Sequence, residues 1–358
     1  MESLRWLRLA PLAVVVAAGV LGSGRPAAGA GAEPAWDPPP CPVTDGGGPP
    51  GAGAWYRVDP VLDRSGTLAA QRLTIGVAGR PSRHLELAPE SFASGPAGGL
   101  VLVGEDDGTV SRLRLLDPAR GCATAVADEP AVIRSAILDP GGRSIVEHRV
   151  NRLTRADLGI WRRTIGGPAI LLLDGLEPDP EQGPTFATDV VIAADGRLVV
   201  SSCAMEACRI RVLDPVGGVV DQFRGTGPAL GVTGGSVVVR AACPGLPCPV
   251  EAIDIASGRR TTLSEDAGAA VLGGPTGTDL VFETAGDRVA VLEVATSRRV
   301  TAREAGGVPL RAGSTATAGA EAPPGRVALA PRGRPAATTI HSFDPISGSS
   351  AQLTEASR

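Results

Sequence analysis

The segment from residue 148 to residue 163 holds the densest set of side chains that could recognise another molecule. It carries five arginines and Trp161 against one acid, Asp157. Arginine binds carboxylates and phosphates through paired hydrogen bonds, and Arg and Trp are enriched at the energetic centres of protein interfaces. The segment therefore predicts a contact surface for an anionic partner. The residues that we expect to form it are Arg149, Arg152, Arg155, Asp157, Trp161 and Arg162.

The alternative for this segment is a solvated loop. In that interpretation Trp161 covers the edge of a strand and Arg155 pairs locally with Asp157. Many exposed arginines contribute nothing measurable to stability, so a run of them can lack a partner altogether.

Residues for covalent catalysis are scarce. All 34 basic residues are Arg, and the absence of Lys excludes a Schiff-base enzyme, a Walker A phosphate loop and a Ser–Lys nucleophile pair. The motifs G-x-S-x-G and H-E-x-x-H are also absent. The three histidines, His84, His148 and His341, are scattered, and a lone His on a strand is usually structural. The sequence thus predicts no catalytic residue.

Two acidic clusters could hold a cation. One runs from Glu105 to Thr109, and the other comprises Asp174, Glu177, Asp179 and Glu181. Calcium takes several oxygen ligands, but Asp-Gly turns and acidic Pro-rich loops are also common without any metal. We expect no metal and no cofactor, with calcium at one of these clusters as the alternative. The formal net charge of −4 argues against a nucleic-acid partner, which needs a basic face.

Residues 1–32 have the pattern of a secretory signal peptide. Arg5 and Arg8 precede an uncharged apolar run, and small residues at 28–32 fit a cleavage site. Removing residues 1–30 takes away three Arg and one Glu, which leaves 31 − 37 = −6 on the mature chain. We expect a protein that is secreted or extracytoplasmic, in the cell envelope. An uncleaved signal is the alternative and would give the only membrane contact, although the run is short for a span.

Six cysteines in an exported chain are expected to form disulfides. Two Cys pairs each enclose four residues, and the second pair follows the first by 40 residues. Each pair lies between two strand-like runs, so a hairpin would bring its sulfurs together, and the remaining two cysteines pair by elimination. The alternative is one four-cysteine zinc site across neighbouring loops. The expected pairs are Cys203–Cys208, Cys243–Cys248 and Cys41–Cys122.

A turn in which a strand ends at an acid recurs along the chain. The acids are Asp117, Asp214, Asp254, Glu293 and Asp344, at spacings of 97, 40, 39 and 51 residues. Residues 185–223 show four strand-like runs within one period. We therefore expect an all-β fold, a β-propeller of four-stranded blades over 55–358, after a Gly/Pro-rich linker at 33–54. Seven blades fit the turns, with six or eight as alternatives, and a β-sandwich is the competing fold.

The start of two strands resembles a known repeat. Asp139-Pro140-Gly141-Gly142 and Ala194-Asp195-Gly196-Arg197, each followed by apolar residues, resemble the PD40-type repeat of TolB-like and WD40-like propellers. The resemblance implies an exported propeller that works by binding other proteins. The turns at 254–258 and 344–348 are similar to those of lactonase-type propellers, which implies the alternative function. We expect a non-catalytic propeller that binds a protein or other anionic partner; the alternative is a lactonase or other hydrolase with acids around the central channel.

Overall fold

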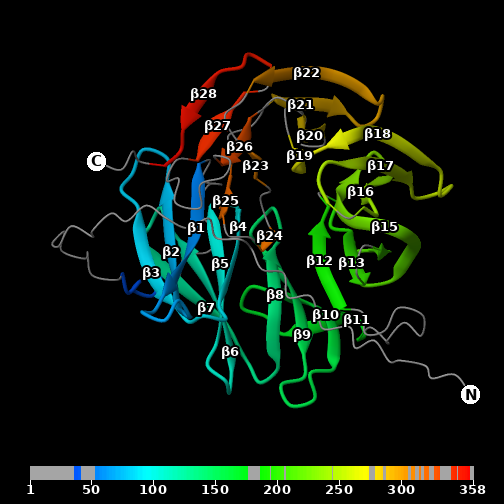
Figure 1. The fold of residues 1–358 in the computed structure, drawn as a ribbon. Helices are drawn as coiled ribbons and strands as arrows, with labels where there is room; N and C mark the ends of the chain where they lie inside the picture. Colours follow the sequence, from blue (N-terminus) through cyan, green and yellow to red (C-terminus); the bar gives the residue numbers. More distant parts are fainter. Residues whose placement is uncertain are drawn as a thin grey trace, which may run out of the picture. The chain divides into compact units, whose positions relative to one another are not determined.

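Apolar and polar residues alternate through the described part of the chain, and these stretches form antiparallel strands (Figure 1). The predicted signal peptide lies outside the described residues. Within them, no helix is long and apolar enough to cross a membrane. The computed structural model describes residues 36–41, 53–175, 186–193, 195–204, 207–243, 245–273, 279–284, 288–304, 308–310, 314–315, 318–321, 326–330, 340–344 and 346–354.

The strands follow one another along the chain with short connections. They are β1 (Ala54–Leu62), β2 (Leu68–Val77), β3 (Arg83–Leu87), β4 (Phe92–Ala97), β5 (Leu100–Asp106), β6 (Ser111–Asp117), β7 (Cys122–Glu129), β8 (Val132–Leu138), β9 (Ser144–Val150), β10 (Asp157–Thr164), β11 (Ala169–Leu173), β12 (Phe186–Ile192), β13 (Leu198–Ala204), β14 (Ala207–Leu213), β15 (Val219–Thr233), β16 (Ser236–Ala241), β17 (Cys248–Asp254), β18 (Arg260–Ala267), β19 (Ala270–Gly273), β20 (Asp279–Thr284), β21 (Arg288–Glu293), β22 (Arg298–Glu304), β23 (Val308–Pro309), β24 (Ser314–Thr315), β25 (Ala318–Ala320), β26 (Val327–Ala330), β27 (His341–Phe343) and β28 (Ser350–Gln352).

Four consecutive antiparallel strands are the recurring unit of this fold. The described strands form six sheets, among them β8–β11 and β19–β22, and a larger sheet runs from β12 to β18. The long strand β15 pairs with β14 through its first half and with β16 through its second half, so it joins two such units. The prediction of an all-β fold with four-stranded units is confirmed. The number of blades stays a prediction.

Late strands of the chain pair with early ones. β25 pairs with β1, and β24 pairs with β4. The backbone N–H of Gly99 also donates to the Glu321 carboxylate at 3.0 Å. The first and last parts of the described chain therefore share two sheets.

The recurring acid caps the turn between the third and fourth strands of a unit. In Asp117, Asp214, Asp254 and Asp344, Oδ1 accepts a backbone N–H from two or three residues further on, at 2.8–3.0 Å. An Asp side chain that closes such a turn replaces hydrogen bonds that the backbone would otherwise lack. The spacing that marked the repeat in the sequence thus has a local structural cause.

Aliphatic side chains fill the space between neighbouring sheets. One buried cluster joins Ile160 and Leu172 of the β8–β11 sheet to Leu198 and Val200 of the next sheet. Burial of such side chains stabilises the fold by about 1.5–3 kcal/mol each relative to exposure. This packing sets the distance between neighbouring sheets. It therefore decides which polar side chains near the ends of the strands can contact the next sheet.

Part of the predicted linker packs against the strands. The backbone N–H of Trp36 donates to the carbonyl of His84 at 2.8 Å, and that of Cys41 donates to the carbonyl of Ala123 at 2.8 Å. The Arg83 guanidinium lies 4.9 Å from the centre of the Trp36 ring. Residues 36–41 therefore extend the surface of the propeller, and the other residues of the predicted linker up to 52 lie outside the described residues.

The six cysteines form three disulfides in the pairs that the spacing predicts. The Cα–Cα distances are 4.9 Å for Cys41–Cys122, 3.9 Å for Cys203–Cys208 and 6.3 Å for Cys243–Cys248. Cys203 and Cys208 lie directly opposite each other in the β13–β14 ladder. The disulfides are consistent with an extracytoplasmic protein, and they leave no thiol for the alternative zinc site.

Candidate functional site

The arginine-rich segment forms the hairpin of β9 and β10. Its strands end at Val150 and resume at Asp157, so residues 151–156 make the connecting loop. Because side chains alternate across a strand, the segment presents different residues to its two neighbouring sheets. Glu147 and Trp161 are cross-strand partners on one face, and His148 and Ile160 are partners on the other.

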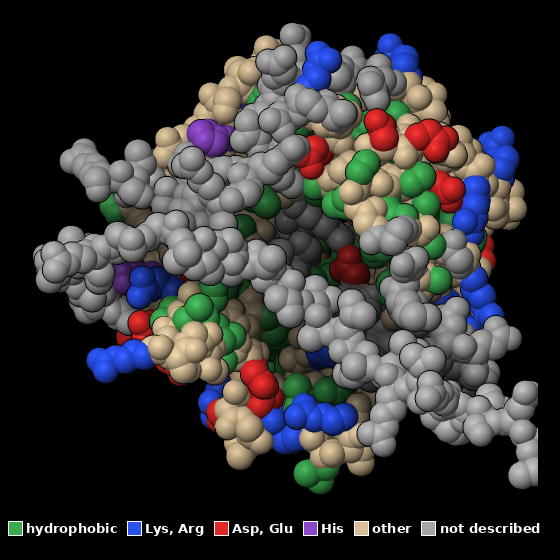
Figure 2. All heavy atoms as spheres, in the orientation of Figure 1, with side chains coloured by type: hydrophobic (Ala, Val, Ile, Leu, Met, Phe, Trp, Pro, Cys, Tyr) green, Lys and Arg blue, Asp and Glu red, His purple; other side chains and the backbone are tan. Residues whose placement is uncertain are grey.

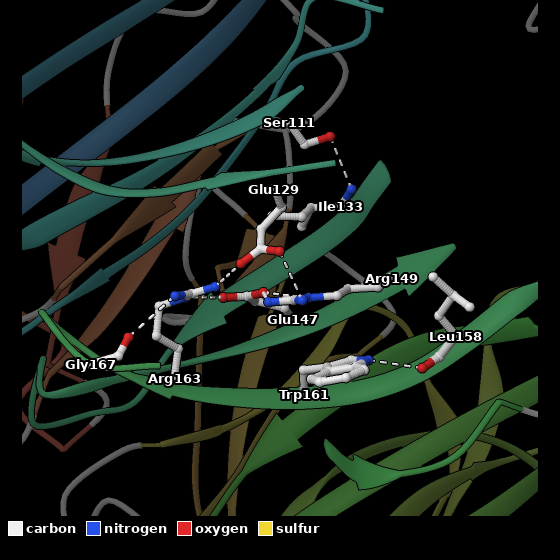
Figure 3. A network of polar contacts seen from close by, with 9 residues as sticks. All are labelled: Ser111, Glu129, Ile133, Glu147, Arg149, Leu158, Trp161, Arg163 and Gly167. Atoms are coloured by element: carbon white, nitrogen blue, oxygen red, sulfur yellow. Dashed lines mark hydrogen bonds and ion pairs between the residues drawn. The ribbon is translucent and has the colours of Figure 1, made fainter. Parts of the chain in front are cut away.

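Two of the arginines belong to a buried ion network (Figure 3). Arg149 donates to Glu147 through Nε at 2.8 Å and through Nη2 at 2.5 Å, and to Glu129 through Nη1 at 3.0 Å. Arg163 donates to Glu147 through Nε at 2.9 Å and also to Glu129. Two guanidinium groups thus face two carboxylates, which balances the charge, as a buried network requires.

Trp161 lies against this network. Its ring centre is 4.6 Å from the Arg149 guanidinium, and its indole N–H donates to the carbonyl of Leu158 at 2.8 Å. Stacking of this kind is a cation–π contact, in which the ring face attracts the positive charge. Trp161 therefore stabilises the hairpin itself, and Arg149 is occupied inside the fold, which differs from the exposed contacts expected for both residues.

Arg152 fastens the loop to the neighbouring sheet. Its two terminal nitrogens donate to the Asp106 carboxylate at 2.7 and 2.8 Å, and its Nε donates to the carbonyl of Pro130 at 3.1 Å. The hydrogen bonds from Arg152 lower the pKa of Asp106 to about 2; burial opposes this shift, and Ser111 adds to it. Arg152 is thus held by a bidentate pair and is a positioning residue.

In the first acidic cluster, from Glu105 to Thr109, the carboxylates already pair with neighbouring hydrogen-bond donors. Glu105 pairs with Arg114, and Asp106 pairs with Arg152. Asp107 accepts from Thr109 and from the backbone of Val110, and these hydrogen bonds lower its pKa. Within the described residues no group of three or more His, Cys, Asp or Glu could hold a metal ion. The second cluster lies outside the described residues except for Asp174.

The loop presents an exposed apolar residue at its tip. Asn151 Oδ1 accepts the backbone N–H groups of Leu153 and Thr154, each at 2.9 Å, and the Arg155 N–H donates to the carbonyl of Asn151 at 2.9 Å. Arg155 takes a left-handed backbone conformation, with φ of 59°. These constraints leave the Leu153 side chain 91% exposed, beside an exposed Arg155. The loop thus holds an apolar and a cationic group outward.

The other two predicted residues lie on the opposite face of the hairpin. Arg162 donates to the carbonyls of Pro215 at 2.6 Å and Gly196 at 3.1 Å, and burial lowers its pKa. Asp157 accepts from His148 Nε2 at 3.1 Å, and His148 is buried. Arg162 therefore links the β8–β11 sheet to the next sheet along the chain, and Asp157 closes the hairpin.

The acids that pair with these arginines cannot be recognised from the sequence, because they come from other strands. Leu153 could have been found: Asn151 is the one Asn of the chain, and an Asn that caps a tight loop exposes the residues after it. Figure 2 shows arginines beside acidic side chains at the lower edge of the view, where Figure 1 places the ends of β6 and β9.

The structure resembles solved β-propeller proteins. No protein-family model matches the sequence, and no curated protein matches it at a significant level. A puromycin hydrolase aligns with a TM-score of 0.54 at 12% identity, over 85% of this chain and 52% of that chain. An oligogalacturonate lyase in complex with manganese aligns with a TM-score of 0.51 at 14% identity, over 84% of each chain. This chain therefore spans about half the length of the puromycin hydrolase.

TolB from Acinetobacter baumannii is also similar, with a TM-score of 0.47 at 14% identity, over 76% of this chain and 68% of that chain. At these identities the likenesses show the fold alone. The chain therefore has a β-propeller fold, as the repeats predict. The likeness to these structures does not decide between a binding protein and an enzyme.

Proposed function

We propose that this protein is an exported, non-catalytic propeller that binds a protein partner with an acidic surface through the loop at 151–156. The observation that carries the proposal is the exposed Leu153 on a loop fixed by Asn151 and Arg152. A rigid loop loses little conformational entropy on binding, and an apolar side chain that is already exposed gains by being covered.

The charge of the loop indicates the chemistry of the partner. Arg155 lies exposed beside Leu153, whereas the formal net charge of the chain is −4. A positive tip on a negative protein directs an acidic partner to that point, and salt weakens such attraction. In this proposal Leu153 and Arg155 make the contact, and Asn151 and Arg152 hold the loop in position.

The proposal can be tested with variants of the tip alone. Leu153→Ala with Arg155→Asn removes the apolar and the cationic group, and Asn tolerates the left-handed backbone at position 155. The control is Val216→Ala, which truncates another exposed apolar residue, 80% exposed, in a different loop. A photo-reactive residue at position 153 would cross-link the partner in an envelope extract for identification by mass spectrometry.

We expect the tip variant to lose binding of the purified, cross-linked partner by tenfold or more, since hot-spot truncations cost about 2 kcal/mol or more. Its melting temperature should match that of the wild type, because the changed groups are exposed. The Val216→Ala variant should bind normally. Equal binding by the tip variant and the wild type would refute the proposal.

Export is part of the same proposal. We expect a mature chain that begins near Gly31 or Glu33, since small residues at 28–32 fit signal cleavage. Intact-mass measurement of protein recovered from outside the cytoplasm tests this directly. A mass that retains the first 25 residues would indicate an uncleaved anchor instead.

A further inference from the structure

Three arginines gather on one face of the sheet that follows the hairpin. On β14, Arg209 and Arg211 alternate with the buried Cys208, Ile210 and Val212, so both arginines point to the face opposite to that core. In the ladder to β15, Arg224 lies directly opposite Arg209. Directly opposed residues share a face, so the three guanidinium groups lie together.

This face is turned toward β10 of the neighbouring sheet. Val200, the cross-strand partner of Arg211, packs in one cluster with Ile160 of β10. The carboxylate of Asp157, at the start of β10, acts electrostatically on Arg211. Arg211 therefore lies between two neighbouring sheets, near the ends that carry the 151–156 loop and the Cys203–Cys208 hairpin, and Arg224 is exposed beside it.

Arg211 of this cluster has a side-chain nitrogen without a hydrogen-bond partner among the described residues. Within them, neither Arg211 nor Arg224 lies within 4 Å of a carboxylate, and Nη1 of Arg211 is buried without a hydrogen-bond partner. Burial is the main cause that lowers the pKa of Arg211, and the positive charges of Arg209 and Arg224 lower it further. The negative charge of Asp157 opposes this shift. Asp157 already accepts hydrogen bonds from His148 and Gly159. A buried donor without an acceptor costs free energy, and so do like charges placed together.

The arginines of the β9–β10 hairpin show the contrast. Arg149 and Arg163 share two carboxylates, and Arg152 forms an ion pair with Asp106. The chain can therefore supply acids where arginines are only structural. At Arg211 a group with several acceptor oxygens would satisfy the free donor and offset the clustered charge.

We propose that Arg209, Arg211 and Arg224 form a binding site for an oxyanion group, a phosphate or a carboxylate, between β10 and β14. The Cys203–Cys208 disulfide fixes the hairpin from which Arg209 and Arg211 project. The site is separate from the loop tip at Leu153 and Arg155, and it rests on different residues. A free phosphate ion and an acidic side chain of a partner protein share the chemistry that these arginines recognise.

The test uses the mature, oxidised protein and inorganic phosphate as the probe. Calorimetric titration and thermal unfolding would be measured with phosphate against sodium chloride at equal ionic strength. The variants are Arg211→Gln, and Arg224→Gln, which changes an exposed residue and leaves the core intact. Arg112→Gln is the matched control, because Arg112 is a half-exposed strand arginine that pairs with Asp107 at 2.8 Å.

We expect phosphate to raise the melting temperature of the wild type and of Arg112→Gln. Each site variant should bind phosphate about tenfold more weakly, since one charge-assisted hydrogen bond contributes roughly that factor. Without phosphate, neither site variant should melt lower than the control, because each removes a cation from a repulsive cluster. No phosphate effect beyond that of chloride, or an equal effect in the site variants, would overturn the proposal.

A second arm distinguishes the source of the anion. A short peptide rich in Asp and Glu is titrated into the same proteins. Binding that is tighter than that of phosphate, and that is weakened by Arg211→Gln, assigns the site to an acidic segment of a partner. Phosphate binding that exceeds peptide binding, with the same dependence on Arg211, assigns it to a phosphate ligand. Failure of the Leu153 and Arg155 test leaves this result unaffected, so the two proposals are independent.

Discussion

Replacing Glu147 by Gln should destabilise the protein strongly, because Glu147 holds two buried arginines. Its side chain is fully buried, and its two oxygens accept hydrogen bonds from Arg149 and Arg163. The Gln variant keeps one acceptor oxygen but loses the charge. Arg149 and Arg163 would then share only Glu129, which leaves one buried positive charge in excess.

The expected loss follows from general values for buried ion pairs. Removing one partner from such a pair costs about 3–5 kcal/mol, and we take the lower end because Gln keeps an acceptor. A domain of about 300 residues has an unfolding entropy of about 0.6 kcal/mol/K. A loss of about 3 kcal/mol therefore lowers the melting temperature by about 5 °C.

Differential scanning calorimetry of the purified protein measures this shift. Glu86→Gln is the matched control, because Glu86 is 59% exposed and 4.0 Å from Arg72. We expect it to change the melting temperature by about 1 °C or less. The double variant Glu147→Gln with Arg163→Gln restores the charge balance and should lose less than the sum of the single changes. A shift for Glu147→Gln no larger than that for Glu86→Gln would refute the reasoning.

Two further predictions concern acid stability and the disulfides. The pKa of Asp106 is about 2 in the folded protein and 3.8 in a free side chain, so the unfolded state binds the proton more readily. The stability that Asp106 contributes is complete above about pH 4 and is lost as the pH falls toward about 2. The difference in melting temperature between the wild type and Asp106→Asn should therefore shrink over that range. A constant difference would contradict this prediction. The Cys41–Cys122 disulfide joins residues 81 positions apart, and chain entropy predicts a contribution of about 4.5 kcal/mol, against about 2 kcal/mol for Cys203–Cys208 with a separation of five. Serine substitution of both cysteines in each bond, followed by thermal unfolding, should therefore lower the melting temperature more for the first bond than for the second, and the reverse order would contradict the entropic argument.

The fold could be predicted because its signals are local. An Asp that caps a turn, as Asp254 does, needs only the few residues after it. The 40-residue spacing of the two short disulfides follows from the same repeat, since both lie at the same hairpin of consecutive units. Periodicity of this kind needs no knowledge of distant partners.

The partners of the arginines could not be predicted, because they depend on packing between sheets. Arg152 pairs with Asp106, 46 residues away, and Arg149 pairs with Glu129, 20 residues away. In the sequence these arginines look alike, and only the register of the strands decides which side of the hairpin each one faces. For this reason the sequence predicts Arg149 and Arg152 at a partner surface and does not predict Leu153 there.

The two faces of the β9–β10 hairpin differ in how the charges of their arginines are balanced. On the face with Arg149 and Arg163, each buried cation has an acid, which is the arrangement that a stable interior needs. On the other face, Arg211 lies near Arg209 and Arg224, and Asp157, which acts on Arg211, accepts a hydrogen bond from His148. An unbalanced cluster is costly for the unliganded protein, and a ligand that supplies the missing charge recovers that cost on binding.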